Sequence, residues 1–154
     1  MIEDYLKQVV SIYSNTNSKI KYVGQAGLIL AYGKSYPNIL KHSYTMGEKK
    51  QCYQNSFHLA LESNLTYCEG FAVSGGVGIP FEHAWCIDKD ENVIDVTWSD
   101  GVEYYGIAFS TQFVLKRAEK TKIYGIFGLR PEQKWFEKGF NRKDLFRKVV
   151  NYVN

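Results

Sequence analysis

The spacing of apolar residues predicts an amphipathic helix over residues 2–13. Apolar side chains recur there at intervals that place them on one helical face: Ile2, Leu6, Val9, Val10 and Tyr13. The polar run 15–18 ends this helix. Residues 19–47 have no clear period, since the apolar run 26–31 fits either a helix or a buried strand and Pro37 marks a break.

A second helical period follows Cys52. The polar run 47–51 precedes this cysteine, and apolar residues recur at helical spacing after it: Tyr53, Phe57, Ala60 and Leu61. The pattern therefore predicts Cys52 at or just before a helix N-terminus. The unpaired N–H groups and the dipole of a helix N-terminus favour a thiolate there, and the polar approach indicates access from the surface.

The middle of the chain is rich in predicted strands, at residues 65–73, 82–88, 92–98 and 103–109. Glycines at 75, 76 and 78 predict a mobile loop over 74–78 that ends at Pro80 and forms a flap beside His83. Later patterns predict a short helix over 113–118, a strand over 122–127 and a final helix over 144–153. Helices before and after an antiparallel central sheet predict a single α+β domain over residues 1–154.

Composition narrows the class of protein. The chain has 154 residues, 45% hydrophobic and 23% charged, which is ordinary for one globular domain. No apolar run approaches the roughly 18 residues of a membrane span, and the first residues are acidic where a signal peptide is basic. The three cysteines are odd in number and form no CxxC pair, which argues against a disulfide framework. We therefore expect a cytoplasmic protein without a membrane partner.

The positive charge is concentrated near the C-terminus. Residues 116–154 hold eleven Lys or Arg against four acids, within a chain of formal net charge +3. Such a region can face nucleic acid or an acidic partner. It has no glycine–aromatic RNA motif, zinc-finger spacing or arginine-rich block, so a solvated helical face is the preferred interpretation and a nucleic-acid partner is not expected.

Cys52, His83 and Asp95 are the residue types of a thiol-dependent catalytic site. A thiol is a strong nucleophile only as thiolate, so it needs a nearby base, and the base needs an acceptor that fixes its tautomer. A hairpin can unite the last two residues. If residues 89–91 form a three-residue turn, Trp85 pairs with Asp95, and His83 and Asp95 project from the same face within side-chain reach. A two-residue turn at 90–91 would place Asp95 on the opposite face.

The other histidines and a metal site are weaker candidates. His58 falls inside the apolar helix that follows Cys52, and His42 lies in an unpatterned stretch. A zinc site made from His83 and the three cysteines fits no structural zinc spacing. No metal or cofactor is therefore expected.

Four segments together resemble the transglutaminase-like superfamily, over about residues 50–98: Cys52 at a helix start, Tyr67-Cys68-Glu69-Gly70-Phe71-Ala72, His83-Ala84-Trp85 and Asp95-Val96-Thr97-Trp98. The resemblance implies a papain-like core in which a cysteine opens a helix packed on a central antiparallel sheet. It implies Cys52 as nucleophile, His83 as general base and then acid, and Asp95 as the residue that orients His83.

The same resemblance leaves the reaction open among related acyl transfers. Transglutaminases proper take an oxyanion donor from a tryptophan before the nucleophile, whereas every tryptophan here follows Cys52. The candidates for oxyanion or substrate contact are Gln51, Gln25, Trp85 and a backbone N–H. Hydrolysis of an amide, peptide or isopeptide bond is the leading expectation, with a protein, peptide or small amide as substrate. Acyl transfer to an amine, deamidation and a non-catalytic peptide-binding module are the alternatives.

Overall fold

The computed structural model describes residues 1–14, 19–129 and 131–147. Its elements follow in the order α1 (Ile2–Tyr13), α2 (Gly24–Tyr32), β1 (Lys34–Ser35), α3 (Cys52–Glu62), β2 (Thr66–Ser74), β3 (Pro80–Ile87), β4 (Val93–Ile94), β5 (Gly101–Ala108), α4 (Thr111–Thr121), α5 (Gln133–Lys138) and a 3-10 turn, Arg142–Asp144. This arrangement confirms the α+β class. No helix in the described ranges combines the length and apolar character needed to cross a membrane.

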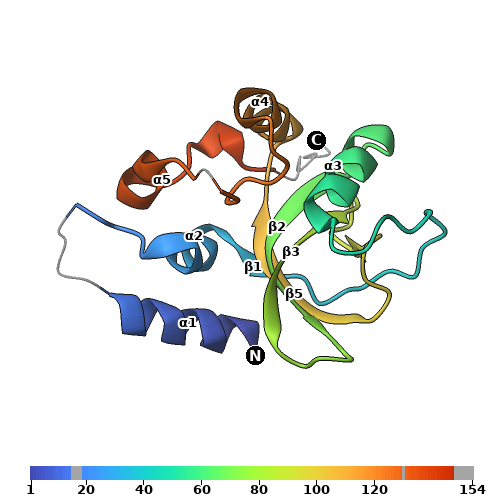
Figure 1. Ribbon diagram of the computed structural model, residues 1–154, viewed down its shortest axis with the longest axis horizontal. Helices are drawn as coiled ribbons and strands as arrows, with labels where there is room; N and C mark the ends of the chain where they lie inside the picture. Colours follow the sequence, from blue (N-terminus) through green and yellow to red (C-terminus); the bar gives the residue numbers. More distant parts are fainter. Residues whose placement is uncertain (15–18, 130, 148–154) are drawn as a thin grey trace, which may run out of the picture.

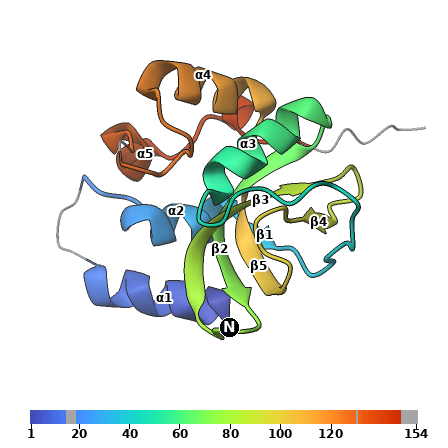
Figure 2. The same cartoon turned by 45° about the vertical axis from the view of Figure 1, so that its right-hand side comes forward.

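The strands form one antiparallel sheet in the order β1-β5-β2-β3-β4. The long strands β2, β3 and β5 make up its centre, and the two-residue strands β1 and β4 lie at its edges. Figures 1 and 2 show α1 and α2 lying together at one end of the sheet and α3 and α4 lying together at the other.

Two apolar clusters correspond to the two faces of the sheet, because successive residues of a strand point to opposite faces. The larger cluster joins all five helices to residues such as Phe71 of β2 and Ile107 of β5. The smaller cluster lies on the other face and contains Tyr36, Cys68, Ala72, Trp85, Ile87, Val93 and Tyr104. Cys52 belongs to the helix-covered face.

Most predicted elements are present. The helix over 2–13 is confirmed with the same bounds, the helix that begins at Cys52 is confirmed, and the ambiguous run 26–31 is part of α2. The strands predicted at 65–73, 82–88 and 103–109 correspond to β2, β3 and β5, each shifted by one or two residues at its ends. The helix predicted over 113–118 is longer, because Ser110 caps α4 by accepting a hydrogen bond from the Phe113 N–H.

Three predicted elements are wrong in the described residues. The strand over 92–98 ends at Ile94, because Asp95 turns the chain. The stretch 122–127 forms bends and no strand. The final helix does not begin at Asp144, since Leu145 is extended and bridges to Phe109; the part of this prediction beyond residue 147 lies outside the described residues.

The register of the β3–β4 hairpin follows the three-residue turn. Cys86 pairs with Ile94, and the Asp88 N–H donates to the Asn92 carbonyl at 3.1 Å. Glu91 occupies the turn's left-handed position with φ 64°. This register brings His83 and Asp95 to one face of the sheet, as the alternation predicts.

Hydrogen bonds to Asp100 anchor the glycine loop between β2 and β3. The Asp100 carboxylate accepts from the Ser74 hydroxyl at 2.6 Å and the Gly76 N–H at 3.1 Å, and its backbone carbonyl accepts from the Gly75 N–H at 2.8 Å. These bonds tie the loop to the start of β5 and oppose the predicted mobility of a flap.

Candidate active site

Cys52 is the first residue of α3, as the sequence predicts. Its side chain is 9% exposed, whereas Cys68 and Cys86 are 0% exposed. Burial raises the pKa of both of those other thiols. Cys52 is therefore the cysteine best placed to react with a molecule from solvent, although it is more enclosed than the polar run before it suggests.

The segment around Asp95 is fastened to the start of α3. The Gly47 N–H donates to the Val96 carbonyl at 2.7 Å. The Asn55 side-chain amide donates to the Thr97 hydroxyl at 2.9 Å and to the Glu48 carbonyl at 2.8 Å. A Cβ at Gly47 would overlap the Asn55 amide, so glycine permits this close approach. These bonds connect the helix that positions Cys52 to the loop that positions Asp95.

His83 and Asp95 form a buried hydrogen-bonded pair. The distance from His83 Nε2 to Asp95 Oδ2 is 2.7 Å, and the two side chains are 1% and 3% exposed. Because the ionised carboxylate only accepts, Nε2 carries the hydrogen. Cys52 is the other group whose interaction with the imidazole raises the pKa of His83, and Nδ1 is the ring nitrogen left to face the thiol. The structure thus brings the three predicted catalytic residues together in the order thiol, imidazole, carboxylate.

The pKa shifts of the pair reflect opposing causes. Burial lowers the pKa of His83, but its hydrogen bonds and charge interactions with Asp95 and Cys52 outweigh burial and raise that pKa to about 9. Burial likewise raises the pKa of Asp95, but the hydrogen bond and charge of His83 and two backbone N–H groups hold it below its ordinary value. Both shifts favour a charged imidazolium–carboxylate pair.

Asp95 is held by four hydrogen bonds to its carboxylate. Oδ1 accepts from the N–H groups of Thr97 and Trp98, at 2.8 and 3.0 Å. Oδ2 accepts from the Tyr104 hydroxyl at 2.8 Å in addition to His83. The first two bonds make an Asx-type turn that ends β4 and fixes the carboxylate rotamer. The orientation of His83 therefore depends on a carboxylate that cannot easily rotate.

The remaining predicted contact residues lie in different surroundings. Gln51 is exposed and occupies the N-cap position of α3 without a capping side-chain hydrogen bond, and it helps to line a pocket of about 280 Å³ together with Met46, Gly47, Asn55, His58 and Val96. Gln25 lies in the first turn of α2, and its enclosed Nε2 has no hydrogen-bond partner among the described residues. Trp85 is fully buried in the smaller cluster. Of the three side chains, Gln51 is the one that adjoins Cys52 and faces solvent.

The cysteines do not converge on a metal site. Cys68 belongs to the smaller cluster, whereas Cys52 and Cys86 belong to the helix-covered cluster on the other face of the sheet. Within the ranges that the structure describes, no group of three or more His, Cys, Asp or Glu residues is arranged to hold a metal ion.

Glu69 is a fully buried carboxyl near the site for which the sequence pattern predicted no role. Its oxygens accept from the Tyr67 hydroxyl at 2.7 Å and from the Ile126 and Phe127 N–H groups at 2.6 and 2.9 Å. Burial raises the pKa of Glu69, and these three donors oppose that shift. Gly125, in the loop that Glu69 holds, packs against the ring of Tyr53, the residue after Cys52. The sequence feature that could have revealed Glu69 is a charged residue in the middle of an otherwise apolar predicted strand.

His42 is a second residue whose position the sequence did not reveal. Its Nε2 donates to the backbone carbonyl of Asp95 at 2.8 Å. The competing histidine His58 instead lies near the Tyr124 hydroxyl, at 3.2 Å, away from the triad.

No family model, curated protein or solved structure matches this chain. The chemistry of the site therefore rests on the geometry of its own residues.

Proposed function

We propose that this protein is a thiol-dependent acyl-transfer enzyme with a papain-like, transglutaminase-like core, which hydrolyses an amide, peptide or isopeptide bond. The observation that carries the proposal is the buried His83–Asp95 pair, 2.7 Å from nitrogen to oxygen, with Cys52 at a helix N-terminus where its interaction raises the pKa of the imidazole. The three free cysteines fit a reducing, cytoplasmic setting.

In this mechanism the proton of Cys52 passes to Nδ1 of His83, and the thiolate attacks the substrate carbonyl carbon. The raised pKa of His83 favours this ion pair in the resting enzyme. His83 then protonates the leaving amine as the carbon–nitrogen bond breaks, which leaves a thioester on Cys52. A water molecule, deprotonated by His83, attacks the thioester and releases the acid and the thiol.

The oxyanion of the tetrahedral intermediate needs donors close to the sulfur. The N–H groups of the first turn of α3 have no partner within the helix, and the helix dipole adds positive potential there. Gln51 is the adjoining side chain with an amide to offer. We assign the oxyanion contact to this helix start, with Gln51 as the side-chain donor, rather than to the buried Trp85.

Transfer of the acyl group to an amine is the second candidate, because the same thioester can be attacked by an amine in place of water. It is favoured by the enclosure of the thiol, which at 9% exposure limits the access of water. A basic amine that follows the leaving group into the site would then compete with hydrolysis.

An activated ester tests the proposal without knowledge of the natural substrate. p-Nitrophenyl acetate should release a burst of p-nitrophenolate equal to the enzyme present, and intact mass spectrometry should find an acetyl group on Cys52. Cys52→Ala should give neither signal. His83→Gln should lower the burst rate by about two decades or more, as expected when a general base is removed.

Adding a primary amine to the acetylated enzyme distinguishes hydrolysis from acyl transfer. Acetylated amine as the main product identifies transfer, and acetate as the main product identifies hydrolysis. Acetylation of Cys52 at the same rate in the wild type and in His83→Gln would contradict both reactions, since the thiol would then be an ordinary nucleophile.

A further inference from the structure

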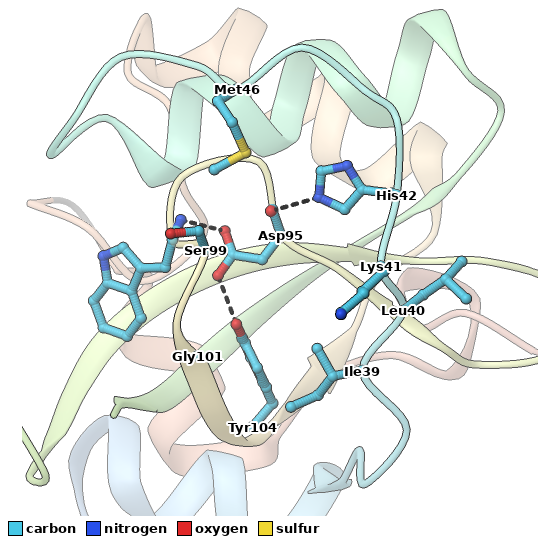
Figure 3. A pocket seen from close by; sticks show the side chains of 10 residues that line it. Ile39, Leu40, Lys41, His42, Met46, Asp95, Ser99, Gly101 and Tyr104 are labelled. Atoms are coloured by element: carbon cyan, nitrogen blue, oxygen red, sulfur yellow. Dashed lines mark hydrogen bonds between the residues drawn. The ribbon is translucent and has the colours of Figure 1, made fainter. Parts of the chain in front are cut away.

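A pocket of about 470 Å³ lies beside the triad but does not contain its nucleophile. Its walls come from the 39–46 segment, from the turn that follows β4 and from the start of β5, as Figure 3 shows for Lys41, His42, Met46, Asp95, Ser99 and Tyr104. Neither Cys52 nor His83 lines it. The volume is within the range of small-molecule sites, about 300–1,000 Å³.

The lining combines apolar walls with the ammonium group of one lysine, Lys41. Ile39, Leu40 and Met46 are each more than two-fifths exposed, which is high for such side chains in so short a segment. The amine end of Lys41 turns toward the side of the pocket formed by Asp95 and Tyr104 (Figure 3). Lys41 forms no ion pair with any residue in the described ranges.

The Asp95 carboxylate is not available as a counter-ion for the Lys41 ammonium group. Each of its oxygens already accepts two hydrogen bonds, and its charge is balanced by His83. An ammonium group at the edge of a partly apolar pocket, with no counter-charge, attracts an anion, because hydrogen bonds between charged groups are stronger than those between neutral ones. The charge pattern therefore selects a ligand with a negative group at one end and a short apolar body at the other.

We propose that this pocket is a second binding site, for a small molecule that joins a carboxylate or similar anionic group to an apolar chain or ring. The anionic group pairs with Lys41, and the apolar body packs on Ile39 and Met46. This site goes beyond the proposed acyl transfer, because Lys41, Ile39 and Met46, which contact the ligand, do not take part in that reaction.

Trp98 and Asp95 connect the pocket to catalysis. Trp98 lines the pocket and stacks on the His83 ring, with centroids 3.9 Å apart. Asp95 lines the pocket and bonds the same ring. A ligand that presses on these two side chains changes the surroundings of His83 without touching Cys52, so occupancy of the pocket regulates the triad.

Hexanoate, hexanol and hexylamine provide matched probes of equal chain length that differ in charge. The readout is the indole N–H resonance of Trp98 in two-dimensional NMR, assigned with a Trp98→Phe variant. Hexanoate should shift this resonance saturably, and hexanol and hexylamine should bind at least about tenfold more weakly, because each lacks the charge that pairs with an ammonium group.

Two variants test the residues. Lys41→Gln should weaken hexanoate binding about tenfold or more, while Lys49→Gln, an exposed lysine outside the pocket, should leave it unchanged. Met46→Glu, which adds a negative charge to the wall, should abolish it. Equal binding of the three probes, or unchanged hexanoate affinity in Lys41→Gln, would overturn the proposal.

The binding measurement is independent of turnover. Cys52→Ala should bind hexanoate as the wild type does, so a failure of Cys52 to form an acyl enzyme leaves this result intact. In the wild type, saturating hexanoate should also change the rate at which iodoacetamide alkylates Cys52. An unchanged rate would overturn the regulatory link between the pocket and the triad.

Discussion

Trp98 lies flat against the imidazole of His83, with ring centroids 3.9 Å apart and an interplanar angle of 17°. The N–H of the same tryptophan donates to Asp95 Oδ1 at 3.0 Å. One residue thus covers a face of the His83 ring and helps to fix the carboxylate that holds it. In the proposed mechanism Trp98 is a positioning residue, because it acts through His83 and Asp95.

Removal of this stack should loosen the imidazole. We expect Trp98→Ala to slow the alkylation of Cys52 by iodoacetamide about ten- to a hundredfold, since small displacements of a catalytic base have effects of that size. Trp98→Phe keeps an aromatic face and should retain most of the rate. Equal rates in Trp98→Ala and the wild type would show that the stack does not position His83.

The three cysteines should differ sharply in reactivity. At mildly acidic pH, iodoacetamide should label Cys52 first, because Cys68 and Cys86 are fully buried and burial raises their pKa values. Peptide mapping after partial labelling measures this order, and Cys52→Ala should leave a protein that resists labelling until it unfolds. Earlier labelling of Cys68 or Cys86 would remove Cys52 as the nucleophile.

Asp95→Asn should preserve the fold and damage the chemistry. The amide oxygen can still accept from the Thr97 and Trp98 N–H groups, which leaves the amide NH₂ facing His83 Nε2. The ring must then carry its hydrogen on Nδ1, where it cannot accept the proton of Cys52. We expect the rate of acylation by p-nitrophenyl acetate to fall by about two to four decades. The corresponding substitution in serine proteases, which favours the wrong tautomer, lowers turnover by a similar factor.

The control for this variant is its stability. Urea unfolding should show a much smaller change for Asp95→Asn than for Asp95→Ala, which leaves the His83 ring and two backbone N–H groups without their acceptor. Acylation within about threefold of the wild type in Asp95→Asn would contradict the assigned tautomer.

The pH dependence of the free energy of unfolding should reflect the loss of a proton from His83. Its pKa is about 9 in the folded protein against an ordinary value of 6.5, so the folded state binds the proton more tightly. The stability that this proton contributes is complete below about pH 6.5 and is lost as the pH rises through about 9. Urea midpoints across this window should therefore fall in the wild type.

Two variants identify the group responsible for that fall. His83→Gln should remove most of the slope between pH 6.5 and 9, whereas His58→Gln, which changes an exposed histidine, should keep it. Nuclear magnetic resonance titration of the imidazole gives the pKa directly. A midpoint for His83 at or below 6.5 would contradict the imidazolium–carboxylate pair.

Glu69 should be important for stability. Glu69→Ala leaves the Ile126 and Phe127 N–H groups without an acceptor in the interior, and we expect the free energy of unfolding to fall by about 3 kcal/mol or more. Glu82→Ala changes an exposed carboxylate on the neighbouring strand and should shift the free energy of unfolding by less than about 0.5 kcal/mol. Chemical denaturation measures both, and similar values would refute a structural role for Glu69.

Local sequence patterns were sufficient to predict how the central part of the site is arranged. The helical period after Cys52 predicted a helix that begins at that residue, and α3 does begin there. Alternation along the hairpin, with a three-residue turn, predicted His83 and Asp95 on one face. Both are short-range properties: backbone geometry fixes which side chains share a face once the element and its turn are known.

The tertiary structure decided where the chain leaves regular structure. The strand predicted through Trp98 ends at Ile94, because the Asp95 carboxylate takes the next two free N–H groups into a turn. The apolar stretch 122–127 was predicted as a strand, yet Glu69 accepts the N–H groups of Ile126 and Phe127 from more than fifty residues away. Buried backbone donors must find acceptors, and hydropathy does not reveal that a distant carboxylate supplies them. The sequence by itself therefore determined the residue types of the proposed site and the faces on which they lie, whereas packing determined how His83 is held and which pocket lies beside it.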